Sequence, residues 1–541
     1  MKRWMLAALA LVGLGAGAET VVLDDIRGYG WQGEQLVRFS RLIIEDGKVK
    51  ARGGSELAIP EGARVRDLDG RTVLPGLIDA HGHVMGLGFN ALRVDLAGTT
   101  SLAQALDRVR RFARKNPAPA WITGRGWNQE LWPDRRMPRA RDLALVEDPR
   151  PIWLRRVDGH AGWANQAALK LAGITAKTKA PEGGAILRDK DGRPTGVLVD
   201  NAMALVERLI PEPSEAEKEA ALTAALQILA GVGLTSVHDA GVDLDSWQRF
   251  ERRGDRLSSR LHVMLAAEPA LWQRLGVQQP RFDDRLQARA VKLYADGALG
   301  SRGAALLADY HDKPGHRGLM IYQPGELESL IRQAAGLGFQ VNVHAIGDAG
   351  NRRVLDAFAA LPKDQRQGRR HRIEHAQVVA LEDIPRFKAL DIIASVQPSH
   401  ATSDMNMAEN RLGKQRIRGA YAWQRFLDAG VAIAAGSDFP VESANPFYGL
   451  YAAVSRQDHQ GKPRDGWYGD QALTREQALY GFTRGAAFAA FMEDRVGALA
   501  PGQWADLLIL DRDYFQVPVA EIWQLRPRET WLAGEVVHVG P

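Results

Sequence analysis

The chain has 541 residues, of which 45% are hydrophobic and 25% are charged. This composition excludes disordered, collagen-like and multi-span membrane proteins. The 70 Lys and Arg residues outnumber the 65 Asp and Glu residues by a net charge of only +5, and they form no long basic run, so we expect no nucleic-acid partner. The sequence contains no cysteine, which removes disulfides, thiolate metal ligands and cysteine nucleophiles.

The N-terminus has the pattern of a secretory signal peptide over residues 1–18. Lys2 and Arg3 precede an apolar stretch over residues 6–14, and Ala16-Gly17-Ala18 matches a small-residue cleavage site. The alternatives are a membrane anchor and a buried N-terminal helix, but the apolar stretch is too short for a hydrocarbon layer of about 30 Å. We therefore expect an exported protein, periplasmic or secreted, with no stable membrane anchor after cleavage.

Both ends of the chain contain short apolar or alternating runs typical of strands. The pairs Asp46-Gly47, Asp69-Gly70 and Ala533-Gly534 favour hairpin turns between such runs. We predict a small β-sandwich domain built from both termini, residues 19–75 and 496–541. Its expected strands are residues 20–23, 42–45, 65–69, 505–511, 529–533 and 536–539.

The middle of the chain alternates buried-strand patterns with helical stretches such as residues 215–229, 324–336 and 352–360. This α/β pattern predicts a (β/α)8 TIM barrel over residues 76–495. The gap between the first two strands is too long for one connection, so we place an insertion at about residues 90–220. The eight expected strands are residues 73–78, 234–238, 261–266, 290–294, 340–344, 371–375, 392–396 and 431–435.

Histidines and one aspartate follow the expected barrel strands. His81 and His83 form a His-x-His pair at the end of the first strand, and in an extended backbone residues i and i+2 point the same way. His344, His375 and Asp438 end three further strands, at the barrel face that carries catalytic residues. Each residue taken singly could be a structural polar group. Together they predict a metal site, and neutral imidazole suits zinc.

Lys292 lies between apolar residues in the fourth expected strand. Burial disfavours an ammonium and lowers the pKa of the amine. Lys292 could instead pair with Asp296 or another acid, or extend to the barrel mouth. We favour carboxylation, because a neutral amine that adds CO₂ becomes an anionic oxygen ligand able to bridge two cations.

These residues together resemble the amidohydrolase superfamily, and more narrowly its branch with the YtcJ-like proteins and N-substituted formamide deformylase. The similarity runs from about residue 19 to the C-terminus, and it includes the end segment around Gly497 and Ala505-Asp506-Leu507. The motifs that carry it are Gly124-Arg125-Gly126-Trp127, residues 157–165, Asp296-Gly297-Ala298-Leu299-Gly300-Ser301-Arg302, His344-Ala345-Ile346-Gly347-Asp348 and Gly436-Ser437-Asp438-Phe439-Pro440-Val441.

The resemblance implies a distorted barrel with a β-sandwich and one or two divalent metal ions, usually zinc. It implies that His81 and His83 hold the more buried ion, that His344 and His375 hold the other, and that carboxylated Lys292 bridges them. From its place after the last strand, we predict that Asp438 is the general base that takes a proton from water and passes it to the leaving amine. An additional metal ligand or a helix cap are its other interpretations.

Three residues outside this set are candidate contacts to a small-molecule substrate. Trp127 and His160 lie in the insertion, as do Trp132 and Trp163, although ordinary packing would also explain the tryptophans. Arg302 follows Gly300-Ser301 and could bind a carboxylate or satisfy loop carbonyls.

We therefore expect a metal-dependent hydrolase that cleaves a non-peptide C–N bond, an amide or a formamide, in a small molecule. The alternatives are the same site acting as a deaminase, lactonase, phosphotriesterase or Xaa-Pro-type dipeptidase, and an exported binding protein without catalysis. The sequence leaves the substrate, the number and identity of the metal ions and the oligomeric state open, a homodimer included.

Overall fold

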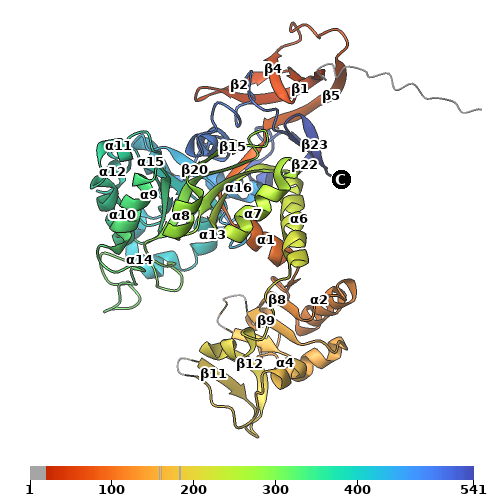
Figure 1. Cartoon of the computed structure of the whole chain (residues 1–541), viewed down its shortest axis with the longest axis vertical. Coiled ribbons are helices and arrows are strands. Elements are labelled where there is room, and N and C mark those ends of the chain that lie inside the picture. The colour runs from red at the N-terminus through yellow and green to blue at the C-terminus, as the bar shows by residue number, and fades with distance from the viewer. Residues whose placement is uncertain (1–19, 157–158, 160, 182–183) are drawn as a thin grey trace, which may run out of the picture. The chain divides into compact units, whose positions relative to one another are not determined.

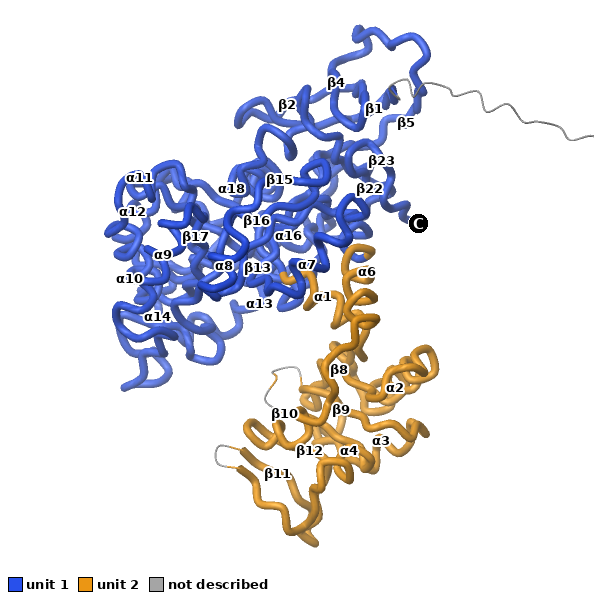
Figure 2. The backbone as a smooth tube through the Cα atoms, viewed as in Figure 1, with its two compact units in different colours: residues 1–82, 228–541 blue, residues 83–227 orange. Residues whose placement is uncertain are grey.

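The structure is a computed structural model, and it describes residues 20–156, 159, 161–181 and 184–541. The expected signal peptide and His160 lie outside the described residues. The chain divides into two compact units, coloured separately in Figure 2. Unit 1 comprises residues 1–82 and 228–541, and unit 2 comprises residues 83–227.

Unit 1 contains a nearly closed barrel of eight parallel strands, which confirms the predicted fold class. The strands pair in the order β20-β19-β18-β17-β16-β14-β13-β6, and a parallel bridge between Gly82 and Phe439 joins the two ends of this order. Their bounds are β6 Leu77–Gly82, β13 Leu234–Val242, β14 Arg260–Leu265, β16 Leu286–Tyr294, β17 Gln340–Ala345, β18 Arg372–His375, β19 Ile393–Val396 and β20 Ile433–Ala435. β15 (Gln278–Arg281) pairs with β16 outside this order.

The first barrel strand differs from the one expected at residues 73–78. Residues 73–75 end β5 (Arg64–Pro75), which belongs to another sheet, and the barrel strand begins at Leu77. Gly76 separates the two strands, and a Cβ atom there would lie 2.2 Å from Oγ1 of Thr235. The sequence prediction was wrong because one apolar run crosses a boundary between two sheets.

Helices follow the barrel strands along the chain, and α9, α10 and α12 lie outside the strand layer in Figure 1. Three of the helices occupy the predicted segments, namely α6 (Glu215–Gly231), α9 (Glu326–Gly336) and α10 (Asp348–Ala359). The other helices that follow the strands are α7 Leu244–Arg253, α8 Pro269–Leu275, α11 Lys363–Arg366, α12 Ile384–Ala389, α13 Pro398–Asp404, α14 Ala408–Arg416, α15 Trp423–Asp428, α16 Pro446–Ser455, α17 Arg475–Tyr480 and α18 Ala486–Ala489.

The two ends of the chain together form a separate eight-stranded sheet in unit 1, where the fold class predicted a small β-sandwich built from both termini. Two-residue turns join β3 to β4 at Asp46-Gly47 and β22 to β23 at Ala533-Gly534, with positive φ at all four residues. Asp69-Gly70 is not a turn, because β5 continues through it with positive φ at both residues. The remaining strands of this sheet are β1 Thr20–Gln32, β2 Gln35–Phe39, β3 Arg41–Glu45, β4 Lys48–Gly53, β21 Leu507–Leu510, β22 Pro527–Leu532 and β23 Glu535–Val539.

Unit 2 has a six-stranded sheet with its own apolar core. The strands pair in the order β11-β12-β10-β9-β8-β7, and three buried tryptophans, Trp127, Trp132 and Trp163, lie in one cluster of that core. The elements of this unit are α1 Val84–Ala91, β7 Val94–Asp95, α2 Leu102–Lys115, β8 Ile122–Trp127, α3 Ala140–Leu143, β9 Ile152–Arg156, β10 Ala161–Ala164, α4 Gln166–Leu171, β11 Gly184–Arg188, β12 Pro194–Asp200 and α5 Ala204–Glu207.

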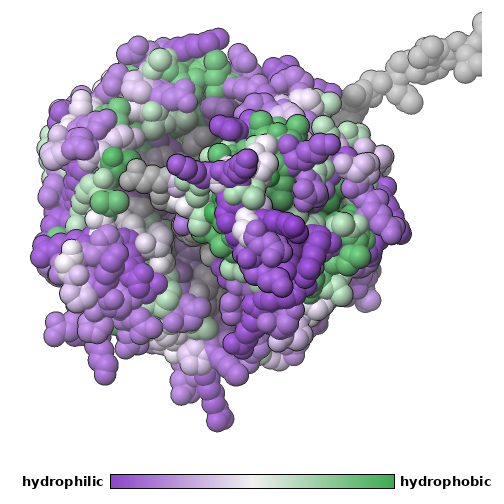
Figure 3. Space-filling view, turned by 90° about the horizontal axis from the view of Figure 1, so that it is seen from below, coloured by the Kyte–Doolittle hydropathy of each residue, from purple (hydrophilic) through white to green (hydrophobic). Residues whose placement is uncertain are grey.

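Among the described residues, no helix combines the length and the apolar character that a membrane crossing needs. On the face shown in Figure 3, hydrophilic residues predominate and hydrophobic residues form separate patches between them.

Candidate metal centre

His81 and Asp438 meet at the carboxyl ends of the first and last barrel strands. His81 is the second-last residue of β6 and is buried, and its Nδ1 atom lies 2.5 Å from Oε2 of Glu374. Its Nε2 atom is 3.7 Å from Oδ1 of Asp438, whose own backbone N–H donates to the His81 carbonyl. His83 directly follows β6, and the ligand atoms of His81, His83 and Asp438 all lie within 4.8 Å of one another.

His344 and His375 face each other from adjacent strands, β17 and β18. Their ring centroids are 4.5 Å apart, and the His375 centroid is 4.9 Å from that of His81. Burial lowers the pKa of His344 to about 3 and that of His375 well below its ordinary value, so both rings are neutral and keep a lone pair for a ligand. Among the described residues, the buried Nε2 atom of His344 has no hydrogen-bond partner.

Lys292 lies near the carboxyl end of β16, two residues before Tyr294, and is 1% exposed. Its Nζ atom is 4.0 Å from the centroid of the Tyr294 ring, and no carboxylate among the described residues lies within 4.0 Å of it. Asp296, the alternative partner, instead accepts hydrogen bonds from the backbone N–H groups of Ala305, Ile346 and Gly347. Burial lowers the pKa of Lys292 to about 8.

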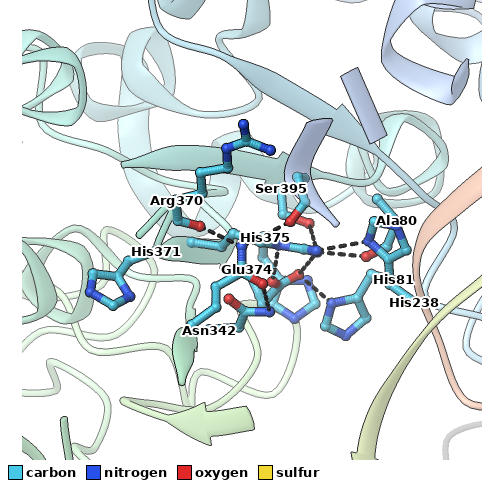
Figure 4. Close-up of polar contacts among 12 residues, drawn as sticks. Ala80, His81, His238, Asn342, Arg370, His371, Glu374, His375 and Ser395 are labelled. Atoms are coloured by element: carbon cyan, nitrogen blue, oxygen red, sulfur yellow. Dashed lines mark hydrogen bonds and ion pairs between the residues drawn. The ribbon is translucent and has the colours of Figure 1, made fainter. Parts of the chain in front are cut away.

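The residues beneath the histidines form a buried polar network (Figure 4). The Arg372 guanidinium donates to Nδ1 of His238, to the Ala80 carbonyl, to Oγ of Ser395 and to Glu374. Arg372 and Glu374 are both fully buried. Burial opposes ionisation of Glu374, but Arg372 and His81 outweigh it and lower the pKa of this carboxyl to about 2. Glu374 is therefore a carboxylate, and it fixes the ring of His81.

Sequence reasoning missed three residues at this site, namely Glu374, Gln397 and His400. The Nδ1–H group of His375 donates a hydrogen bond of 2.7 Å to Oε1 of Gln397. His400 lies in α13, and its Nε2 atom is 3.7 Å from Oδ2 of Asp438. In the sequence, the only sign that Glu374 and Gln397 belong to the site is their position beside a strand end. The pattern of apolar residues does not show whether a polar side chain at such a position faces the site or packs elsewhere in the fold.

The predicted substrate contacts lie in other surroundings. Trp127 is fully buried in the core of unit 2, and its indole N–H donates to the Leu154 carbonyl. Arg302 forms an ion pair with Asp312, which also binds Arg411. The structure thus assigns protein partners to Trp127 and Arg302, and their contact with a substrate stays a prediction.

The donor set fits a divalent metal such as zinc. The Nδ1 atoms of His81 and His375 are held by Glu374 and Gln397, which leaves the Nε2 atoms of both rings for an ion, and metal-binding histidines are commonly oriented in this way. Neutral imidazoles beside a carboxylate are typical of zinc sites. His375 and Asp438 also have φ angles of +75° and +62°, the kind of uncommon backbone conformation that occurs at active sites.

Comparison with known proteins agrees with this geometry. The chain matches the amidohydrolase family over residues 64–538. It is 32% identical to the putative amidohydrolase YtcJ of Bacillus subtilis, over 93% of this chain and 97% of that protein. It is 30% identical to the N-substituted formamide deformylase of Arthrobacter pascens, over 92% of this chain and 93% of the deformylase.

A solved structure shares the fold of most of this chain. The crystal structure of an uncharacterised metal-dependent hydrolase from Pyrococcus horikoshii superposes with a TM-score of 0.77 at 28% identity, and the match covers 93% of this chain and 99% of that one. The family match spans most of the sequence and includes the strands that carry the histidines. This chain therefore belongs to the amidohydrolase family, whose members use divalent metal ions.

Proposed function

We propose that this protein hydrolyses a non-peptide C–N bond, a carboxamide or a formamide, in a small molecule. The observation that carries the proposal is the position of Asp438, whose carboxylate lies 3.7 Å from Nε2 of His81 at the centre of the histidine cluster. The similarity to an N-substituted formamide deformylase supports a formamide or a related amide as the bond that is cleaved.

In the proposed reaction, His81, His83, His344 and His375 hold one or two divalent ions, most simply zinc. When bound, these ions polarise the scissile carbonyl and lower the pKa of water. Asp438 accepts one proton from the attacking water as the new C–O bond forms. It then returns that proton to the nitrogen as the C–N bond breaks, so that a carboxylic acid and an amine leave.

We also propose that Lys292 carries a carbamate that completes the ligand set. The neutral amine adds CO₂ and releases a proton, which gives an anionic group in place of a buried ammonium. Two observations support this: Lys292 is 1% exposed, and burial lowers its pKa to about 8. Protein loaded with zinc in ¹³C-labelled bicarbonate should bind one labelled carbon per chain, and the Lys292→Met variant should bind none. An unlabelled wild-type protein that is full of zinc would contradict the carbamate.

The reaction class is tested with a panel of bonds on the zinc-loaded full chain. Formanilide and acetanilide test the proposal, while a lactone, a phosphotriester, alanyl-proline and cytosine test the alternative activities. We expect amine release from an anilide, and we expect its loss in the Asp438→Asn variant. Turnover confined to the lactone, the phosphotriester, the dipeptide or cytosine would replace the proposal with the corresponding alternative.

Export through cleavage after Ala18 is part of the proposal. It is supported by the signal pattern of residues 1–18 alone. Expression of the full chain in a bacterium with a periplasm should give a soluble periplasmic protein whose first residue is Glu19. A full-length product in the cytoplasm would contradict export.

A further inference from the structure

His400 lies next to two residues of the candidate centre, His375 and Asp438, although it does not end a strand. It belongs to α13, which begins just after β19, and β19 lies between β18 and β20 in the sheet order. β18 carries His375, and Asp438 follows β20. The His400 side chain is 12% exposed, and its Nε2 atom is buried.

The buried nitrogen of His400 faces the carboxylate of Asp438 without bonding to it. Nε2 is 3.7 Å from Oδ2 of Asp438, which is longer than a hydrogen bond. Among the described residues, this nitrogen has no hydrogen-bond partner. Because buried polar atoms are nearly always satisfied, a group absent from the protein chain is expected to complete the bonding of Nε2.

Two occupants could satisfy Nε2 of His400: a metal ion would take the lone pair of this nitrogen, and a substrate oxygen would accept a hydrogen bond from it when it carries a proton. The ligand atoms of His375, His400 and Asp438 lie within 4.8 Å of one another, so an ion could fit among them. The rings of His81 and His375, however, are each held by a side chain at Nδ1. Among the described residues, no side chain bonds to the ring of His400, so it lacks the brace that these two candidate ligands share.

His400 also stacks against His375, with an interplanar angle of 14° and centroids 5.9 Å apart. This contact and the 3.7 Å distance place Nε2 of His400 beside the carboxylate that is proposed to take up the proton of water. The side of Asp438 that faces His400 is the side of Oδ2, whereas Oδ1 faces His81. A substrate carbonyl that approaches Asp438 on the Oδ2 side would therefore meet His400.

We propose that His400 is a further catalytic residue that binds the oxygen of the scissile carbonyl; this inference rests on the proposed amide hydrolysis. As the water oxygen bonds to the carbonyl carbon, the electron pair of the C=O double bond moves to the carbonyl oxygen. The Nε2–H group donates a hydrogen bond to this oxygen and keeps its proton. The C–N bond then breaks, and Asp438 gives the nitrogen its proton.

The test compares His400→Leu, which removes the donor, with His400→Gln, which retains an amide N–H. Loss of one donor to a developing oxyanion lowers kcat about 100-fold or more. We expect that loss in His400→Leu with formanilide, with KM changed less than kcat and with partial recovery in His400→Gln. The exposed His459, which stacks on Trp523, gives a control variant, His459→Gln, that should match the wild type.

A second readout does not depend on turnover. Methylphosphonate has the tetrahedral oxygens that form when water adds to a carbonyl, and calorimetry measures its binding to the zinc-loaded protein. We expect His400→Leu to bind it at least tenfold more weakly than the wild type while holding the same amount of zinc. Lower zinc content in His400→Leu would identify His400 as a metal ligand and overturn the inference.

The two readouts separate this inference from the proposed function. If the wild type cleaves no amide but His400→Leu still loses methylphosphonate binding, the reaction class is wrong and the role of His400 stands. If the wild type cleaves formanilide and His400→Leu matches it in kcat and in binding, the role of His400 is wrong and the function stands. A wild type that binds no methylphosphonate and cleaves no amide would contradict both.

Discussion

Oε2 of Glu374 lies 2.5 Å from Nδ1 of His81, and both side chains are buried. Arg372 holds Glu374 from the other side, so the carboxylate stays ionised inside the barrel. This contact fixes which nitrogen of His81 carries the proton and leaves Nε2 for an ion. The histidine cluster thus depends on a carboxylate one residue before His375.

Replacing Glu374 with Gln should weaken zinc binding about 10–100-fold, the range found when groups that orient metal ligands are lost. The amide keeps the size of the side chain but loses the charge that orients His81. Competition with a chromophoric chelator measures the affinity. Glu493→Gln is the matched control, because Glu493 forms its ion pair with Arg370, outside the histidine cluster. Equal zinc affinity in Glu374→Gln and the wild type would remove Glu374 from the centre.

Asp438→Asn should reduce turnover about 10²–10⁴-fold, which is the contribution of a positioned general base. Zinc content should stay near that of the wild type, because the histidines remain. Steady-state kinetics and metal analysis on the same preparation check both parts. Full turnover in this variant would show that another group takes the proton.

Gly436→Ala should disturb the centre because the added methyl group would collide with neighbouring atoms. A Cβ atom at position 436 would lie 2.5 Å from Oδ1 of Asp79 and 2.6 Å from the backbone nitrogen of His81. We expect a loss of about 1–3 kcal/mol of stability, as for other overpacked sites, together with weaker zinc binding. Gly336→Ala is the control, since a Cβ atom at position 336 in α9 meets nothing within 4 Å. In thermal unfolding, Gly436→Ala should melt at a lower temperature than Gly336→Ala. Equal melting temperatures of the two variants would contradict this prediction.

His371 should make stability fall in acid. Its ring is fully buried, with Nδ1 accepting from the Val341 N–H and Nε2–H donating to the Gln365 carbonyl. Burial lowers its pKa from 6.5 to about 4. Between these values the unfolded chain binds a proton that the folded chain does not, so the stability that is complete above pH 6.5 is lost as pH falls toward 4.

The slope from one such group is up to about 1.4 kcal/mol per pH unit. His371→Asn keeps one donor and one acceptor but cannot take up a proton. In the presence of a chelator, its melting temperature should therefore fall less between pH 6.5 and 4.5 than that of the wild type. Identical slopes for the two proteins would mean that His371 does not contribute.

Much of the centre could be predicted because its residues end strands. His81, His344, His375 and Asp438 each follow an apolar run, and the carboxyl ends of parallel strands meet at one face of a barrel. His400 escaped this reasoning because it lies in a helix after its strand, and no periodicity shows that such a side chain turns inward. Glu374 escaped it because neighbouring strand residues point to opposite faces. The φ angle of +75° at His375 interrupts that alternation, so Glu374 and His375 both reach the cluster.

The fold was predictable for a similar reason, and its one misplaced strand shows the limit. Apolar runs and helical stretches gave the order of the barrel, but residues 73–82 form two strands in two sheets. The break at Gly76 reflects its close approach to Thr235, a residue more than 150 positions away. Such a long-range contact is invisible to local patterns. At Asp69-Gly70, the local sequence does not show that β5 continues through the pair instead of reversing in a hairpin turn.

The most direct test of the metal centre is a crystal structure of the zinc-loaded protein with anomalous data on both sides of the zinc absorption edge. We predict an anomalous peak within bonding distance of the Nε2 atoms of His81 and His375, and of ligand atoms of His83 or His344, with Asp438 beside it. Fully occupied zinc bound elsewhere, with these four imidazoles turned away from one another, would contradict the account.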